Sequence, residues 1–346
     1  MINTLIADDS PLARSILRDF LESDPAFRII GEADDGEDAV QKTLALNPDL
    51  VTMDIEMPKM TGLEAIDAIM KKMMVPIVVI SSQDTAKTAY EATVKGALEF
   101  YSKDLFSSAM SPAKQARIFE TLKRISGVKG QRSGALEALT ETKVIEDRKI
   151  AAVVIASSTG GPKALSRLFS LMPGDFPVPL MVVQHNSSGF DRSFVQWLND
   201  YTELEVKLAE EGEIPIKGKI YVAQTDKHLA LRSGGPAGTD APGFSLAYTD
   251  DEPENNQKPA ADVLFRTAAQ TLGKSVVSVV LTGMGSDGAE GTRNIKELGG
   301  ITLAQDEDSS LIYGMPRAAR ETGCVDRVLP LDRIPEELSA LTKGSR

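Results

Sequence analysis

The sequence predicts an α/β protein with two domains, each built on a mostly parallel, doubly wound sheet with helices on both faces. Short apolar segments alternate with amphipathic segments of helical period along both halves of the chain, which is typical of repeated βα units. The length of 346 residues exceeds the size at which a single hydrophobic core usually stops growing. We therefore expect a first domain at residues 1–124, a linker at residues 125–148 and a second domain at residues 149–346.

The strands expected from this pattern form two series. In the first domain they lie at residues 3–7, 28–33, 50–53, 76–80 and 97–101. In the second domain they lie at residues 149–156, 179–183, 219–223, 276–281 and 300–304. Residues 125–148 are rich in Gly, Lys, Ser, Thr and Glu, which is typical of a linker. Residues 232–260 are rich in Gly, Pro, Asp and Asn, which favours a hairpin or a long surface loop.

Composition and charge exclude several classes of function. The apolar share of 42% and the charged share of 25% are those of a soluble folded protein, and no apolar run approaches the ~18 residues of a membrane span. The 38 Lys and Arg residues are outnumbered by 50 Asp and Glu, and the net charge of -12 argues against nucleic-acid binding. The chain opens on a predicted strand instead of a signal peptide and has one cysteine, Cys324, so we expect a cytoplasmic protein without an intramolecular disulfide.

Polar residues gather at the strand ends of the first domain. Asp8 and Asp9 end the first predicted strand, Asp54 follows the third, Ser81 follows the fourth and Lys103 follows the fifth. These ends are adjacent in a parallel sheet, and three carboxylates in one pocket suit Mg²⁺. The lysine and the hydroxyl would bind an added phosphoryl group. Any one of these aspartates alone is better explained as a helix N-cap, but such residues at four strand ends together favour a site.

These residues belong to motifs that resemble the receiver domain of two-component response regulators. The motifs are Ala7-Asp8-Asp9-Ser10, Met53-Asp54-Ile55-Glu56-Met57-Pro58, Thr61-Gly62, Ser81 and Ser102-Lys103. The resemblance implies a flavodoxin-like fold and Asp54 as the phosphoacceptor. It also implies an Mg²⁺ ion held by Asp8, Asp9, Asp54 and the Glu56 carbonyl, with Ser81, Phe100 and Lys103 as the switch residues. Asp104 departs from the pattern, because receivers usually have proline after the lysine.

The second domain combines a serine, a histidine and an aspartate at predicted strand ends. Ser158 lies between a strand and a glycine-containing turn that opens a helix, and His185 directly follows the next strand. His228 is the only other histidine of the chain. Asp287 lies in the turn after a later strand, where it could orient His185 while Ser158 attacks a carbonyl carbon. The backbone N–H of Met284 in the same turn could receive the oxyanion.

Other interpretations of these segments remain open. Residues 157–161 also fit a phosphate-binding loop or an ordinary N-cap, and the G-x-S-x-G elbow of α/β-hydrolases is poorly supported because Ala156 occupies the first glycine position. Residues 283–288 spell G-x-G-x-x-G with Asp306 further on, which is the dinucleotide-binding pattern. Against that pattern, Asp287 would place a carboxylate in the turn meant for a pyrophosphate.

Nearly the whole chain resembles the chemotaxis methylesterase family, in which a receiver is joined to a protein-glutamate methylesterase domain. The motifs are Ser158-Thr159-Gly160-Gly161-Pro162, Gln184-His185, Gly189-Phe190, Ser193-Phe194, Asp226-Lys227-His228, Asp262-Val263-Leu264-Phe265, Leu281-Thr282-Gly283-Met284-Gly285-Ser286-Asp287-Gly288, Ala304-Gln305-Asp306-Glu307 and Gly314-Met315-Pro316-Arg317-Ala318. Departures lie at residues 186–188, 224–225 and 257–258, around the expected substrate face.

The resemblance implies hydrolysis of glutamate γ-methyl esters on the signalling helices of chemoreceptors, with glutamine deamidation as a second reaction and no catalytic metal. Ser158 would be the nucleophile, His185 the general base and Asp287 its orienting acid, whereas His228 would be structural or peripheral. A histidine kinase of a chemotaxis-type pathway would be the phosphodonor, and the unphosphorylated receiver would block the active site. The alternatives are a catalytically inactive docking module and a nucleotide-binding enzyme that uses the turn at residues 283–288.

Overall fold

The computed structural model describes residues 1–346 except 82–85, 107–109, 128–148, 187–188, 235–242 and 346. The chain divides into two compact units, Met1–Arg132 and Ser133–Arg346. The expected boundary at residue 124 falls inside helix α5 (Pro112–Ser126), which includes the first two residues of the predicted linker. The rest of that linker lies almost entirely outside the described residues. The domain limits therefore stay a prediction.

The first unit contains a five-stranded parallel sheet in the order β2-β1-β3-β4-β5. Its strands are β1 (Ile2–Ala7), β2 (Phe27–Ala33), β3 (Leu50–Met53), β4 (Ile77–Ser81) and β5 (Glu99–Ser102), each within two residues of the expected bounds. The other helices are α1 (Pro11–Glu22), α2 (Gly36–Leu46), α3 (Gly62–Lys72) and α4 (Ala86–Lys95). This strand order confirms the flavodoxin-like fold.

Local sequence explains where these helices begin. Ser10, Asp35, Thr61 and Ser111 precede α1, α2, α3 and α5, and each accepts a hydrogen bond from the backbone N–H three residues on. At α3 the Glu64 side chain also accepts from the Thr61 N–H, which completes a capping box. Each of these helices begins shortly after the carboxyl end of a strand. The helix starts therefore border the edge of the sheet where the acidic residues lie.

The second unit contains a seven-stranded sheet in the order β14-β13-β12-β6-β7-β9-β8, with every neighbouring pair parallel. The five strands that the sequence predicted are β6 (Ala152–Ser157), β7 (Leu180–Gln184), β9 (Lys219–Val222), β12 (Val276–Val280) and β13 (Ile301–Gln305). Two short edge strands were not predicted, namely β8 (Glu205–Leu208) and β14 (Arg327–Leu329). The doubly wound α/β architecture is therefore confirmed.

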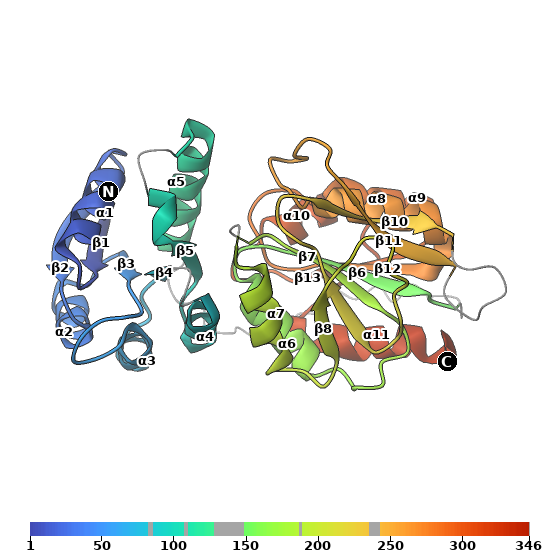
Figure 1. Ribbon diagram of the computed structural model, residues 1–346, viewed down its shortest axis with the longest axis horizontal. Helices are drawn as coiled ribbons and strands as arrows, with labels where there is room; N and C mark the ends of the chain where they lie inside the picture. The colour runs from blue at the N-terminus through green and yellow to red at the C-terminus, as the bar shows by residue number, and fades with distance from the viewer. Residues whose placement is uncertain (82–85, 107–109, 128–148, 187–188, 235–242, 346) are drawn as a thin grey trace. The chain divides into compact units, whose positions relative to one another are not determined.

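Helices cover both faces of this sheet. Figure 1 shows α6 (Gly161–Ser170), α7 (Asp191–Asn199) and α11 (Ile334–Thr342) on one face. It shows α8 (Ala261–Leu272), α9 (Ala289–Glu297) and α10 (Met315–Glu321) on the other. The predicted hairpin region contains an antiparallel pair, β10 (His228–Ser233) with β11 (Phe244–Thr249), whose first strand begins before the expected segment. Among the described residues, no helix is long and apolar enough to cross a membrane.

The strand order places a switch point beside β6. The chain runs from β6 outward through β7 to β8 and β9, and it then returns to the other side of β6 as β12. In open α/β sheets, ligands bind outside the carboxyl ends of the strands at such a point, because the two connections leave in opposite directions and open a crevice. The loops after β6, β7 and β12 therefore form the first place to look for a site.

Candidate active site

The acidic residues of the first unit converge as expected. Oxygen atoms of Asp8, Asp9 and Asp54 all lie within 4.8 Å of one another, and the Lys103 Nζ lies 2.8 Å from carboxylate oxygens of both Asp8 and Asp54. Burial raises the pKa of Asp54, helped by the charge of Asp8, and outweighs the opposing effect of Lys103. Three carboxylates, of which Asp8 and Asp54 are buried and Asp9 is exposed, supply the oxygen ligands that Mg²⁺ prefers. Coordination by the Glu56 carbonyl stays a prediction.

The other receiver residues surround this cluster. Ser81 is buried at the end of β4, and Phe100 is buried on β5 with its ring edge-on to Tyr90 at 4.6 Å between centroids. At the departure from the receiver pattern, the Asp104 N–H donates to the Ser102 hydroxyl at 3.3 Å, and that hydroxyl donates to the Asp104 carboxylate. Asp104 thus closes its own turn through a side chain, in place of the ring constraint that proline would supply. The switch roles stay predictions.

Hydrogen bonds to Gln184 at the end of β7 and to Thr282 just after β12 hold the Ser158 loop on both sides. The Ser158 N–H donates to the Thr282 carbonyl at 3.1 Å, and the Gln184 side chain donates to the Ser158 carbonyl at the same distance. The Gly161 N–H also donates to the Ser158 carbonyl, at 2.7 Å. Gly160 adopts a positive φ of 77° between them, which a residue with a side chain rarely does. Ser158 therefore lies at the start of α6, where the helix dipole favours developing negative charge.

His185 and Asp287 form the hydrogen-bonded pair that the sequence predicts. The His185 Nε2 lies 2.8 Å from the Asp287 Oδ2, and only 4% of the histidine side chain and 2% of the aspartate side chain are exposed. His185 follows β7, and its N–H donates to the Ser157 carbonyl at 3.1 Å, next to Ser158. An ionised carboxylate can only accept, so the Nε2 carries the proton and the Nδ1 is left as the basic atom. The Nδ1 is buried and has no hydrogen-bond partner among the described residues.

Asp287 is held by backbone donors as well as by the histidine. Its Oδ2 accepts from the Ala261 N–H at 2.7 Å, and its Oδ1 accepts from the N–H groups of Asp262 and Gly288, both at 3.0 Å. Burial raises the pKa of Asp287, but His185 and the N–H groups at the start of α8 together outweigh burial and hold this pKa below its usual value. The carboxylate is therefore ionised at neutral pH and can stabilise an imidazolium.

The turn after β12 lies directly against Ser158. A Cβ atom on Gly283 would come within 2.3 Å of the Met315 sulfur and 2.8 Å of the Ser158 Cβ, so only glycine fits there. The Gly283 N–H is already used, since it donates to the Ile312 carbonyl at 3.0 Å. The role of the next N–H, that of Met284, in binding an oxyanion stays a prediction.

The dinucleotide-binding interpretation of residues 283–288 is disfavoured by this geometry. The Asp287 carboxylate accepts from the Gly288 N–H, at the start of α9, where a pyrophosphate would have to bind. Asp306 accepts from the N–H and the hydroxyl of Ser309 and so closes a local turn.

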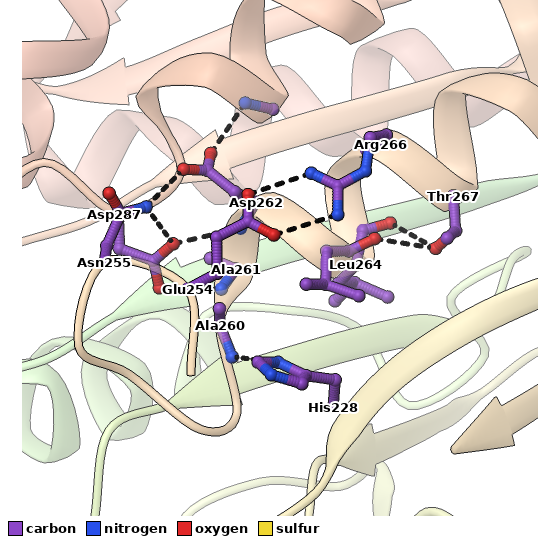
Figure 2. Close-up of polar contacts among 12 residues, drawn as sticks. His228, Glu254, Asn255, Ala260, Ala261, Asp262, Leu264, Arg266, Thr267 and Asp287 are labelled. Carbon is purple, nitrogen blue, oxygen red and sulfur yellow. Dashed lines mark hydrogen bonds and ion pairs between the residues drawn. The ribbon is translucent and has the colours of Figure 1, made fainter. Parts of the chain in front are cut away.

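Sequence reasoning missed two parts of the site. The Gln184 amide donates to the carbonyls of both Ser158 and His185. Asp262 and Asn255 form a hydrogen-bonded group next to Asp287 (Figure 2). The signal for Gln184 was its position beside His185, whereas the grouping with Asn255 depends on a tertiary contact. Of the departures at the substrate face, Ser187 and Ser188 lie outside the described residues.

Fold and site together define a response regulator whose output domain is an enzyme. A family model described as "Response regulator receiver domain" matches residues 4–112, and one described as "CheB methylesterase" matches residues 153–338. The chain belongs to the CheB methylesterase family.

Relatives and a solved structure agree with this assignment. A "Protein-glutamate methylesterase/protein-glutamine glutaminase" of Pyrococcus horikoshii is 40% identical, over 97% of this chain and 92% of the relative. A relative of the same name from Nitrosospira multiformis is 38% identical, over 99% of this chain and 97% of the relative. The crystal structure of the Thermotoga maritima CheB methylesterase catalytic domain is 37% identical and matches with a TM-score of 0.53, covering 56% of this chain and all of that domain.

Proposed function

We propose that this chain is a phosphorylation-regulated protein-glutamate methylesterase that hydrolyses glutamate γ-methyl esters on the signalling helices of chemoreceptors. The observation that carries the proposal is the 2.8 Å contact between His185 and Asp287 beside the Ser158 loop. Its relatives of similar length are named protein-glutamate methylesterase/protein-glutamine glutaminase, which supports the same reactions here. Glutamine deamidation is the second reaction, since the same site would release ammonia from an amide in place of methanol from an ester.

In the first half of the reaction, Ser158 attacks the ester carbonyl carbon. The Ser158 hydroxyl proton passes to the His185 Nδ1, and the Asp287 carboxylate stabilises the imidazolium that forms. Backbone N–H groups of the turn after β12, with that of Met284 among them, stabilise the oxyanion. The C–O bond to the methoxy group then breaks, His185 returns the proton to the leaving oxygen, and methanol departs from a glutamyl ester of Ser158.

In the second half, water takes the place of the alcohol. His185 accepts a proton from the water as the water attacks the acyl carbon, and it gives that proton to the Ser158 oxygen as the ester bond breaks. The products are a free glutamate side chain and the regenerated serine. These steps use only groups of the chain and water.

The receiver domain would control access to this site. A histidine kinase of a chemotaxis-type pathway would phosphorylate Asp54, and Asp8, Asp9 and Asp54 would hold the Mg²⁺ that neutralises the phosphoryl charge. The unphosphorylated receiver would block the entry of a receptor helix. The order of receiver, linker and hydrolase in one chain motivates this gating, and a substrate on receptor signalling helices agrees with the expected cytoplasmic location.

Methanol release from a methylated receptor tests the proposal. We expect release by the native chain, a higher rate after addition of acetyl phosphate and MgCl₂, and loss of activity in Ser158→Ala. Ser170→Ala, at the exposed end of α6, is the matched control and should keep the native rate. A Ser158→Ala variant that releases methanol at the native rate would refute the nucleophile, and an unchanged rate with acetyl phosphate would refute the gating.

A further inference from the structure

A second buried carboxylate lies beside the catalytic acid. Asp262, in the first turn of α8, is 2% exposed. Its Oδ1 accepts from the Gly291 N–H of α9 at 2.6 Å, and its Oδ2 accepts from the Asn255 side-chain nitrogen at 2.6 Å. Its own N–H donates to the Asp287 Oδ1 (Figure 2). Asp262 therefore contacts the catalytic acid through its backbone and, by way of Asn255, through its side chain.

Asn255 bridges the two carboxylates. Its Nδ2 lies 2.6 Å from the Asp262 Oδ2 and 3.5 Å from the Asp287 Oδ1. An amide nitrogen carries two hydrogens, so it can donate to both acceptors at once. Neighbouring carboxylates repel each other unless a donor or a cation lies between them. The Asn255 amide supplies that donor at the point where the two acidic groups approach.

The loop that carries Asn255 is fixed to α8. Asn255 has a φ of 54°, a conformation that asparagine tolerates better than most residues. The carboxylate of the preceding residue, Glu254, accepts hydrogen bonds from both terminal nitrogens of Arg266 of α8 at 2.9 Å. The backbone of Glu254 also pairs with that of Gln257. A bidentate pair of this kind restricts orientation as well as distance.

His228 holds the two ends of the same loop. This histidine is fully buried on β10. The Ala260 N–H donates to its Nδ1 at 3.1 Å, so its Nε2 carries the proton and donates to the Glu252 carbonyl at 3.1 Å. The loop at residues 252–260 is thus closed by one side chain, which gives His228 a structural role and keeps Asn255 over α8.

We propose that Asn255 and Asp262 are positioning residues for the hydrolytic reaction, with the Asn255 amide tying Asp262 to Asp287 so that Asp287 keeps the orientation in which it accepts from His185. The proposal rests on the proposed function, because Asp287 is assigned as the catalytic acid there. Neither residue touches the substrate in this scheme, and both act through Asp287.

The protonation of Asp262 connects this arrangement to pH. Burial, together with the charges of Asp287 and Glu254, raises the pKa of Asp262 to about 6, although the Gly291 N–H and the Asn255 amide lower it. Arg266, on the same helix, is a cation whose charge acts on Asp262. When Asp262 gains a proton, one of its oxygens no longer accepts freely, and the bridge through Asn255 weakens. Activity should therefore fall on the acid side as Asp262 gains its proton.

Asn255→Gly tests the bridge with little other change. Asn255 is exposed, and glycine keeps the positive φ without strain, so the variant should fold normally. We expect kcat to fall by about tenfold with KM unchanged. A tenfold fall in rate is what the loss of one hydrogen bond to a charged group would cause. Asn256→Gly is the matched control, since Asn256 is exposed, has a φ of 58° and should keep the native kcat. Equal kcat values for the two variants would overturn the proposal.

Asp262→Asn supplies a second, independent measurement. Its effect on kcat should not add to that of Asn255→Gly in the double variant, because both changes break the same bridge. The native kcat should exceed that of Asp262→Asn by about tenfold at pH 8 and by less at pH 5, where the native Asp262 carries its proton and the bridge is already weakened. Full additivity, with the same ratio of kcat values at both pH values, would assign both residues a merely structural role.

A spectroscopic readout separates this proposal from the proposed function. The chain has only two histidines, so selective ¹⁵N-histidine labelling gives two sets of ring signals. The Nε2 proton signal of His185 should shift in Asn255→Gly, whereas that of His228 should not. If Ser158→Ala keeps full activity, the proposed function fails. If Ser158→Ala is inactive but the His185 signal and kcat of Asn255→Gly match those of Asn256→Gly, only the bridge proposal fails.

Discussion

Replacement of Asp262 by asparagine should stabilise the second unit at neutral pH. Burial is the main cause that raises the pKa of Asp262 from 3.8 to about 6. The folded chain therefore holds this proton more tightly than the unfolded chain does. The protonated group favours folding, and this contribution to the free energy of unfolding is lost as pH rises from about 4 through about 6. The asparagine variant has no such loss, so its stability relative to the native chain increases with pH.

The size of the effect follows from the pKa difference. A shift from 3.8 to about 6 is about 2 units, which corresponds to about 3 kcal/mol at pH 8. Asparagine also replaces an oxygen that accepts from Asn255 by a donor, at a cost of about 1–2 kcal/mol. We therefore expect Asp262→Asn to be more stable than the native chain by about 1–2 kcal/mol at pH 8. Because the native group is already partly protonated in the folded state at pH 5, this advantage should shrink by about 1.5 kcal/mol there.

Urea unfolding followed by tryptophan fluorescence measures this difference in the right part of the chain. Trp197 is the single tryptophan, and it is fully buried on α7 in the second unit. Unfolding curves of Asp262→Asn and the native chain at pH 5 and pH 8 give the two free-energy differences. Asp251→Asn is the control, because Asp251 is an exposed carboxylate on the neighbouring loop. A difference that is the same at both pH values, or an asparagine variant that is less stable at pH 8, would refute the reasoning.

Three further changes test other parts of the molecule. Gly283→Ala should lower kcat by about a hundredfold, because the new Cβ atom would displace Ser158. Methanol release measures this loss, and the receiver should fold as in the native chain. Asp54→Asn should keep the basal rate of methanol release but lose any rise with acetyl phosphate and MgCl₂, and a remaining rise would exclude Asp54 as the phosphoacceptor. Gln184→Leu should destabilise the second unit by about 1–3 kcal/mol in urea. The change removes the side-chain donor of the His185 carbonyl, one of the two donors of the Ser158 carbonyl and the acceptor of the buried Ser157 hydroxyl.

Much of the fold could be predicted from the sequence because buried parallel strands are continuous apolar runs. Leu50–Met53 and Val276–Val280 are buried at every position and were placed within one residue. Arg327–Leu329 was missed because three residues carry too little pattern. Glu205–Leu208 was missed because an edge strand with alternating charged residues resembles a loop.

The sequence predicts those parts of the candidate site that directly follow a strand, and it does not predict the parts that lie on loops. Ser158, His185 and Asp287 follow β6, β7 and β12, and a parallel sheet brings such positions to one edge whatever the loops do. The packing of a loop decides whether the Nδ1 or the Nε2 of His185 contacts Asp287. This choice leaves no pattern in the sequence. The contact of Asn255 with Asp262 depends in the same way on a loop that is folded back over α8.

The pairing of β6 with β12 has a consequence for biosynthesis. Ala152 lies opposite Val276, and the N–H of Ser158 finds its acceptor at Thr282. Contacts so distant along the chain form late, because a long segment must be closed into a loop before they yield any stabilisation. A nascent chain on the ribosome therefore carries its serine without the strand that supports it. We therefore expect no methylesterase activity until residues 276–282 have left the ribosome and paired with β6.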